Sequence, residues 1–193
     1  MAAQQDLPIV ELADQDQWRD WLEANQASTP GAWLKIAKKS SSTKTVSYAE
    51  AVEEALCYGW IDGQARGYDE HFYVQRFTPR RRRSKWSQIN TEKAARLIAE
   101  GRMKPSGQAQ VDAAKADGRW DAAYPAQSAA AVPEDFEKEL DRNPKAKAFF
   151  ETLTGSARYA FLYRLHNVKS AGARAKRITS YVELLSEGRT LQE

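Results

Sequence analysis

Hydrophobic residues follow two different spacings along the first half of the chain. Between residues 14 and 25, tryptophan and leucine recur every three or four positions, and Asp14 stands three residues before Gln17, the spacing of a capping box. We therefore expect an amphipathic helix there. The segment AWLKIAKK at residues 32–39 alternates instead and ends in a polar SSSTK loop, which predicts a strand.

A second helix and a hairpin are predicted next. Ser47 and Glu50 have capping-box spacing, and apolar residues continue at helical intervals up to Gly59, a suitable closing residue. Residues 60–66 and 72–78, WIDGQAR and FYVQRFT, are typical of strands, and the five-residue loop GYDEH joins them. A loop of this length favours an antiparallel hairpin.

The rest of the chain lacks alternation and is typical of helices. SQINTEKAARLIAEG and PSGQAQVDAAKADG predict two helices that end near Gly101 and Gly118. Residues 124–133, YPAQSAAAVP, carry two prolines among small residues and are typical of a linker. Three helices are expected beyond it, one of them capped by Asn143 with Pro144 at its first position.

These patterns predict an α+β protein with a small antiparallel β-sheet and several helices, followed by a helical C-terminal module. We expect an N-terminal α/β portion with a basic hairpin over residues 1–123, an Ala/Pro linker over residues 124–133, and the helical module over residues 134–193. A chain of 193 residues is long enough to bury a sizeable core in either one or two domains.

Composition excludes several classes of protein. With 42% hydrophobic and 28% charged residues, the chain has neither the composition of a disordered segment nor the apolar runs of a membrane protein. The first residues, MAAQQDLPIVELAD, lack the basic segment and apolar run of a signal peptide. We expect cytoplasmic residence and no membrane span. The single cysteine, Cys57, cannot form an internal disulfide.

The net charge of +3 is unevenly distributed. Residues 71–91 hold six Lys or Arg and no acid, and residues 158–177 repeat this balance. Solvated surface explains such runs as well as anion binding does. Guanidinium groups bind phosphate in a bidentate manner, and Phe77 and Trp86 near the first run are candidates for base stacking or for the core. We predict that its anion-binding residues are Arg80, Arg81, Arg82, Arg83 and Lys85. If the run binds an anion, the partner would be a nucleic acid, an acidic protein or a phosphorylated metabolite.

The segment GWIDG at residues 59–63 is the second candidate site, because glycines allow a ligand to approach the backbone closely. A small-molecule pocket here would use Trp60, Asp62, Gln64, Arg66 and Arg76. Asp62 and Gln64 are two residues apart, so we expect them to share a face of the strand. The competing interpretation is a structural turn with Trp60 in the core.

The familiar catalytic and cofactor motifs are missing from the sequence. Cys57 activated by His71 or His166 would be a nucleophile, but a lone cysteine on a helix is usually a small core residue. The chain holds no His or Cys pair at metal-ligand spacing and no GxxxxGK(S/T), GxGxxG or GxSxG motif. We expect no cofactor and no metal, and favour binding over enzyme activity.

Several separated motifs occur in a characteristic order: GWIDG, QRFTPRR running into SKWS, IAEGRM, DGRWDAAY, and the tail NPKAKAFFETLTGSARYAFLYRLHNVKSAGARAKRI. Together they resemble the YdeI/OmpD-associated family over residues 18–189. The resemblance implies a bacteriocin-protection or antimicrobial-peptide-stress role without an established reaction. A periplasmic role associated with porins would not fit the expected absence of an export signal.

From the resemblance and the charge pattern together, we expect a non-enzymatic cytoplasmic stress or peptide-resistance protein. It would act by binding an anionic ligand or partner. Two alternatives stay open: a nucleic-acid-binding protein, and a small-molecule enzyme with its pocket at the GWIDG segment.

Overall fold

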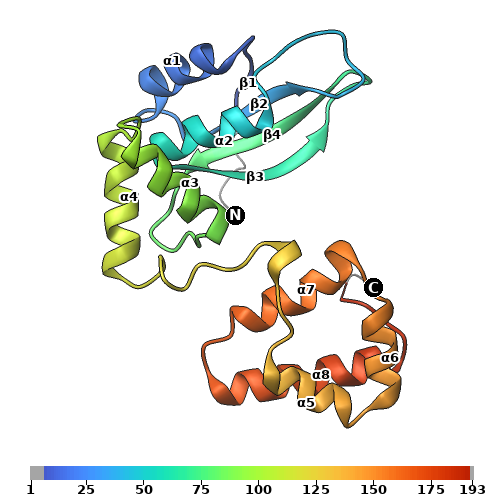
Figure 1. Ribbon diagram of the computed structural model, residues 1–193. Coiled ribbons are helices and arrows are strands. Elements are labelled where there is room, and N and C mark those ends of the chain that lie inside the picture. Colours follow the sequence, from blue (N-terminus) through green and yellow to red (C-terminus); the bar gives the residue numbers. More distant parts are fainter. Residues whose placement is uncertain (1–6, 192–193) are drawn as a thin grey trace. The chain divides into compact units, whose positions relative to one another are not determined.

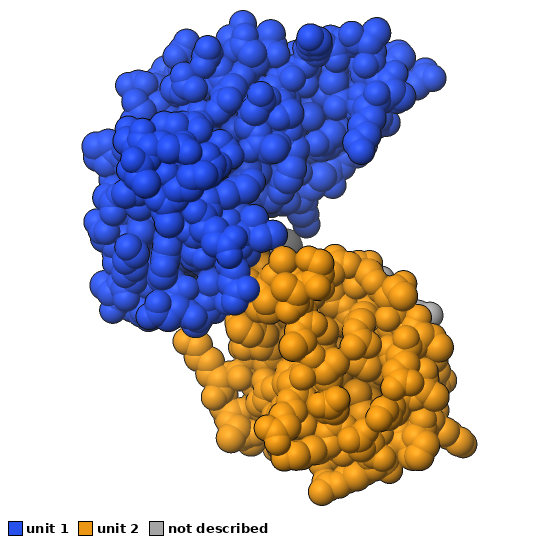
Figure 2. Space-filling model, in the orientation of Figure 1, with its two compact units in different colours: residues 1–123 blue, residues 124–193 orange. Residues whose placement is uncertain are grey.

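The elements of the chain group into two compact units, unit 1 over residues 1–123 and unit 2 over residues 124–193 (Figures 1 and 2). The computed structural model describes residues 7–191. Unit 1 contains a sheet with helices, and the elements of unit 2 in the described residues are helices, so the predicted α+β class is confirmed. That each predicted domain folds by itself stays a prediction.

Unit 1 contains a four-stranded mixed sheet with the strand order β1-β2-β4-β3. The strands are β1 (Ile9–Glu11), β2 (Ala32–Ala37), β3 (Trp60–Gly67) and β4 (Phe72–Pro79). The predicted hairpin is confirmed, since β4 pairs antiparallel with β3 on one side and with β2 on the other. β1 adds a parallel pair with β2 that the sequence pattern did not predict. Three residues are too few to show an alternation.

The described residues of unit 1 also form four helices: α1 (Gln15–Asn25), α2 (Tyr48–Cys57), α3 (Gln88–Ala99) and α4 (Pro105–Ala116). The predicted caps are present at the first two. Asp14 accepts a hydrogen bond from the Gln17 amide at 2.9 Å, and Ser47 and Glu50 form a reciprocal capping box. Gly59 follows α2 with a φ of +75°, a left-handed conformation that turns the chain directly into β3.

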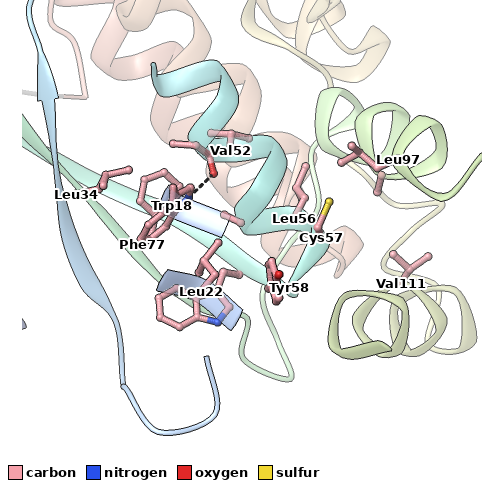
Figure 3. Close-up of a cluster of buried hydrophobic side chains, with 14 of the residues drawn as sticks. Trp18, Leu22, Leu34, Val52, Leu56, Cys57, Tyr58, Phe77, Leu97 and Val111 are labelled. Carbon is pink, nitrogen blue, oxygen red and sulfur yellow. Dashed lines mark hydrogen bonds between the residues drawn. The ribbon is translucent and has the colours of Figure 1, made fainter. Parts of the chain in front are cut away.

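The core of unit 1 lies between the sheet and its helices (Figure 3). Leu34 of β2 and Phe77 of β4 pack in one cluster with Trp18 and Leu22 of α1. The indole N–H of Trp18 donates to the Ala51 carbonyl of α2 at 3.1 Å. This bond satisfies the polar atom of a fully buried ring and ties α1 to α2.

Unit 2 contains α5 (Glu134–Asp141), α6 (Pro144–Thr152), α7 (Gly155–His166) and α8 (Ala171–Ser186), preceded by a short 3-10 helix, η1 (Gln127–Ala129). The prediction of three helices is wrong, because the described part of unit 2 has four α-helices. α5 is only eight residues long, and two residues separate it from α6. Its apolar pattern therefore merges with that of the next helix. The predicted cap is present, since Asn143 accepts from the Ala146 amide at 3.1 Å.

One aromatic ring from each helix of unit 2 meets its neighbours in a closed cycle: Phe136 of α5, Phe150 of α6, Phe161 of α7 and Tyr181 of α8. Each contact is edge-to-face, with ring centroids 5.0–6.4 Å apart. Aromatic pairs of this geometry each add about 0.5–1.5 kcal/mol beyond the area that they bury. The cycle therefore joins all four helices at one point.

Candidate functional site

The two faces of the sheet in unit 1 carry different side chains. Residues directly opposite one another in an antiparallel pair share a face. The register pairs Trp33 with Arg76 and Lys35 with Val74, and on the other side of β4 it pairs Arg66 with Val74. None of these five belongs to the cluster that α1 and α2 cover. We call the face away from these helices the open face and define it by Trp33, Lys35, Arg66, Phe72, Val74 and Arg76.

Cations lie over aromatic rings on the open face. The Arg66 guanidinium reaches from β3 across β4, and its central carbon lies 4.3 Å from the centre of the Trp33 ring on β2. The Lys35 ammonium lies 4.1 Å from the centre of the Phe72 ring. Exposed contacts of this kind are worth about 0.5–1 kcal/mol each. Val74, in the middle of this face, is fully buried, because long side chains rather than a helix cover it.

Arg66 and Arg76 are the cations of the open face that lack an acidic partner in residues 7–191. Lys35 differs from them, because it pairs with Glu11 at 2.8 Å and this hydrogen bond raises the pKa of the ammonium. The Nε–H of Arg76 is buried and has no hydrogen-bond partner among the described residues. The guanidinium groups of Arg66 and Arg76 are therefore the candidates for binding an anion on the open face.

A β-bulge in β3 sets the geometry of the GWIDG segment. The register passes from Asp62 opposite Phe77 to Ala65 opposite Gln75, so two residues of β3 share one position of β4. The prediction that Asp62 and Gln64 share a face is therefore wrong, because the bulge shifts the alternation by one residue.

The predicted pocket residues thus separate into groups. Trp60 is 1% exposed and packs edge-on against Trp21 in the core. Asp62 lies on the helix side of the sheet, where it accepts a hydrogen bond from the Tyr48 hydroxyl at 2.8 Å. Gln64 is exposed in the bulge, and Arg66 and Arg76 are on the open face. The sequence analysis missed Trp33, although its position between buried Ala32 and Leu34 indicated the other face of the strand.

The predicted anion-binding run after β4 is also divided. Arg80 is 6% exposed, its guanidinium lies 3.7 Å above the centre of the Trp86 ring, and it donates to the Lys85 carbonyl at 3.1 Å. Arg80 is thus part of the packed structure rather than the surface. Trp86 is a core residue that packs on Trp120. Exposed members of the run are Arg81, Arg82, Arg83 and Lys85.

Cys57 is buried, and its burial is the main reason why the pKa of the thiol is raised to about 11. The group is therefore protonated at neutral pH and unsuited to act as a nucleophile. Residues 7–191 contain no group of three or more His, Cys, Asp or Glu side chains placed to hold a metal ion.

Glu54 of α2 is a buried charged residue of unit 1 with three hydrogen-bonding partners. Its carboxylate is 2% exposed and accepts hydrogen bonds from Gln15, Arg19 and Arg102 at 2.6–3.1 Å. Burial alone would raise the pKa of Glu54, but these donors outweigh it and lower the pKa. A buried carboxylate with this many donors stays ionised and joins α1, α2 and the loop after α3. We therefore assign Glu54 a structural role.

The fold and this surface define a class: a two-unit α+β protein with a cation-bearing open sheet face. None of the helices in the described residues has the length and apolar content needed to cross a bilayer. Residues 10–110 match the family described as Domain of unknown function (DUF8412). Because this match covers more than half of the 193 residues, the chain belongs to that family.

A second family model matches residues 129–188, under the description Bacteriocin-protection, YdeI or OmpD-Associated. The resemblance predicted from the sequence is thereby confirmed for the C-terminal part of the chain. Its predicted span was too long, since the GWIDG and RFTPRR motifs fall within the DUF8412 match. Comparison with curated proteins and with solved structures found no match.

Proposed function

We propose that the protein serves a role related to bacteriocin protection by binding an anionic ligand on its open face, in the cytoplasm and without catalysing a reaction. The C-terminal family match supports the role. The observation that carries the binding proposal is the pair Arg66 and Arg76, two guanidinium groups on one sheet face without an acidic partner in the described residues.

The chemistry of this pair favours phosphate or carboxylate groups. A guanidinium presents a rigid fork of N–H donors that matches both kinds of anion, and charge-assisted bonds of this type are about twice as strong as neutral ones. Trp33 beneath Arg66 holds that side chain over the face, so less rotamer entropy is lost on binding. The exposed Arg81, Arg82 and Arg83 belong to the same unit and add to its attraction for anions.

The test is the affinity of the full chain for labelled polyphosphate, with two variants of equal charge. Arg66→Gln with Arg76→Gln removes both guanidinium groups of the open face. Lys39→Gln with Lys44→Gln removes two exposed cations of the loop after β2. We expect the first variant to bind at least about tenfold more weakly and the second to bind within about twofold of the parent. Equal losses of affinity in both variants would show that binding depends only on net charge, and this result would overturn the proposal.

Nucleic acid is the second candidate ligand, favoured by one observation: the stacked pair of Trp33 and Arg66 on an open sheet face. Bases stack on both aromatic rings and guanidinium planes. Binding of single-stranded DNA, duplex DNA and RNA at several salt concentrations separates the two candidates. A steep fall of affinity with salt, together with a preference for single strands over polyphosphate, would identify nucleic acid as the ligand. Equal affinity for all polyanions would leave a general anion site.

Cell fractionation tests the proposed cytoplasmic residence. Tagged protein is expected in the soluble cytoplasmic fraction, and recovery from the periplasm would contradict that part of the proposal.

A further inference from the structure

A pocket of about 250 Å³ lies within unit 2, whereas the open face belongs to unit 1. It is formed between residues 124–133, which we call the strap, and the helices α7 and α8. The strap contributes Ala131 and Pro133, α7 contributes Tyr159, Tyr163 and His166, and α8 contributes Arg174. The walls are thus apolar and aromatic, with a cation at one side.

Two contacts hold the strap against α7, which Figure 1 shows beside it. The Tyr159 hydroxyl donates to the Pro125 carbonyl at 2.8 Å, and the Tyr124 ring meets Tyr163 edge-to-face at 4.9 Å. The backbone at Pro133, with φ −65° and ψ 141°, is in the polyproline II region. Because its wall is tied down in this way, the pocket is largely preformed, and a ligand would lose little affinity to ordering it.

Arg174 is held in position at the pocket by three hydrogen bonds. Its Nε and Nη2 atoms donate to the two carboxylate oxygens of Asp135, and Nη1 donates to the Leu165 carbonyl at 2.6 Å. A guanidinium has five N–H donors, so these bonds orient the group without exhausting it. The hydrogen bond from Arg174 is also the main cause of the lowered pKa of Asp135.

Arg174 is the Lys or Arg that lines the pocket, and its three hydrogen bonds leave two N–H groups for a further acceptor. Residues 158–177, which form most of α7 and the start of α8, include six Lys or Arg and no acid. Asp135 is the acid that contacts Arg174, and it uses both oxygens in that contact. A ligand that combines an apolar body with one negative group would fit both the walls and the cation.

The volume limits the size of the apolar body. An engineered cavity of about 150 Å³ in another protein holds benzene, whereas pockets for drug-sized ligands have about 300–1,000 Å³. A pocket of about 250 Å³ therefore accepts one ring or branched chain with a short acidic arm. We propose that this pocket binds a small carboxylic acid with a single apolar ring, with the ring against the tyrosines and the strap and the carboxylate at Arg174.

Titration of the isotope-labelled full chain with 3-phenylpropionate, followed by NMR, tests the proposal. The expected result is saturable shifts of residues in the strap and α7, with the neutral amide of the same acid at least about tenfold weaker. Equal affinity for acid and amide would overturn the assignment of the carboxylate to Arg174. Absence of saturable shifts would overturn the site itself.

Two matched substitutions locate the binding. Ala131→Phe fills the pocket from the exposed strap, and Ala129→Phe places the same ring on the strap at a residue that does not line the pocket. Neither position is part of the core of unit 2. We expect Ala131→Phe to weaken binding at least about tenfold and Ala129→Phe to leave it within about twofold. Equal affinities in the two variants would overturn the location, and thermal unfolding of both checks that unit 2 is intact.

A carboxylate beside an apolar ring also occurs at the end of a peptide whose last residue is phenylalanine. A tripeptide of this kind, with a free or an amidated C-terminus, separates the two sources of the ligand. Stronger binding of the free acid than of either tripeptide supports a small-molecule ligand. Stronger binding of the tripeptide with the free C-terminus would overturn the proposal of a small-molecule ligand and identify the C-terminus of a peptide as the ligand.

Discussion

At the scale of single residues, Glu54 is a buried charge that holds three segments of unit 1 together. It places a negative charge inside the molecule, and Arg19 and Arg102 compensate it from two different segments. Both arginine side chains remain about one-third exposed, at 36% and 32%. Their charges are thus partly screened by water, whereas the charge of Glu54 is not.

Glu54→Gln should destabilise unit 1 strongly. Removing one partner of a buried ion pair costs about 3–5 kcal/mol, and the partial exposure of the arginines places this case near the lower limit. We expect a loss of about 3 kcal/mol in the free energy of unfolding at pH 7, measured by urea denaturation. Asp16→Asn is the matched control, because Asp16 also pairs with Arg19 but its side chain is 80% exposed, and its loss should stay within about 0.5 kcal/mol.

The same carboxylate makes stability depend on pH. The pKa of Glu54 is lowered in the folded state relative to its unfolded value of 4.5, so the ionised group stabilises the fold above that value. This contribution is lost as the pH falls through the lower, folded pKa. The difference in stability between the parent and Glu54→Gln should therefore shrink below pH 4.5. A difference in stability between the parent and the variant that stays constant down to pH 3 would contradict the stabilising role of the ionised Glu54.

The sequence predicted some site residues and misplaced others, for reasons that are local. Arg66 and Arg76 lie on one face of the hairpin, because the antiparallel register places them there, and their role in binding stays a prediction. Asp62 was misplaced relative to Gln64, because the bulge between them cannot be recognised from the alternation of polar and apolar residues. Arg80 could not be separated from the three arginines after it, because only its packing on Trp86 distinguishes it.

At the scale of elements, the contact between α2 and α4 depends on one glycine. A Cβ atom at Gly107 would lie 2.2 Å from the Cys57 carbonyl oxygen at the end of α2 and 2.5 Å from the Met103 sulfur. The carbonyl is backbone and cannot rotate away, so α4 would have to move. The same Cys57 carbonyl accepts a hydrogen bond from the Lys104 amide at 3.0 Å, which holds the start of α4 in place.

Gly107→Ala should accordingly lower the free energy of unfolding by about 1–3 kcal/mol or more, measured by denaturant titration. Gly172→Ala is the comparison, since Gly172 also lies in the first turn of a helix but has no atom within 4 Å of the added Cβ. It should be neutral or stabilise the protein by about 0.5 kcal/mol, because alanine favours helix over glycine. Similar effects of the two substitutions would show that α2 and α4 are not in close contact.

Most elements were predictable, because capping residues and hydrophobic periodicity can be recognised within the segment that forms the element. Asp14, Ser47 and Asn143 each begin a helix where their spacing predicted one. The exceptions are short: β1 has three residues and α5 has eight. Both owe their structure to neighbours, β1 through its pairing with β2 and α5 through packing of its phenylalanine in the aromatic cycle.

At the scale of the whole molecule, the two units have separate hydrophobic cores, one on the sheet and one inside the four helices. Unit 2 is the smaller of the two, and small domains bury a smaller fraction of their surface. We expect two transitions in calorimetry of the full chain, with unit 2 melting first. Glu54→Gln should lower the transition temperature of unit 1 alone. This change shows which of the two transitions belongs to unit 1.

Separate polypeptides of residues 1–123 and 124–193 complete that experiment. Each should unfold cooperatively at nearly the temperature of its transition in the full chain. A single transition of the full chain, or an unfolded fragment, would contradict independent folding.

The strand order has a consequence for the growing chain on the ribosome. β4 is the last strand to be synthesised, yet it occupies the position between β2 and β3. Until residue 79 has emerged, β2 and β3 each lack their partner on one edge, and unpaired edges invite pairing with other chains. The helices α1 and α2 are made earlier and can cover only one face of the unfinished sheet. A nascent chain that stops before β4 therefore leaves unpaired the edges of β2 and β3 that face β4, and the addition of this one strand pairs both.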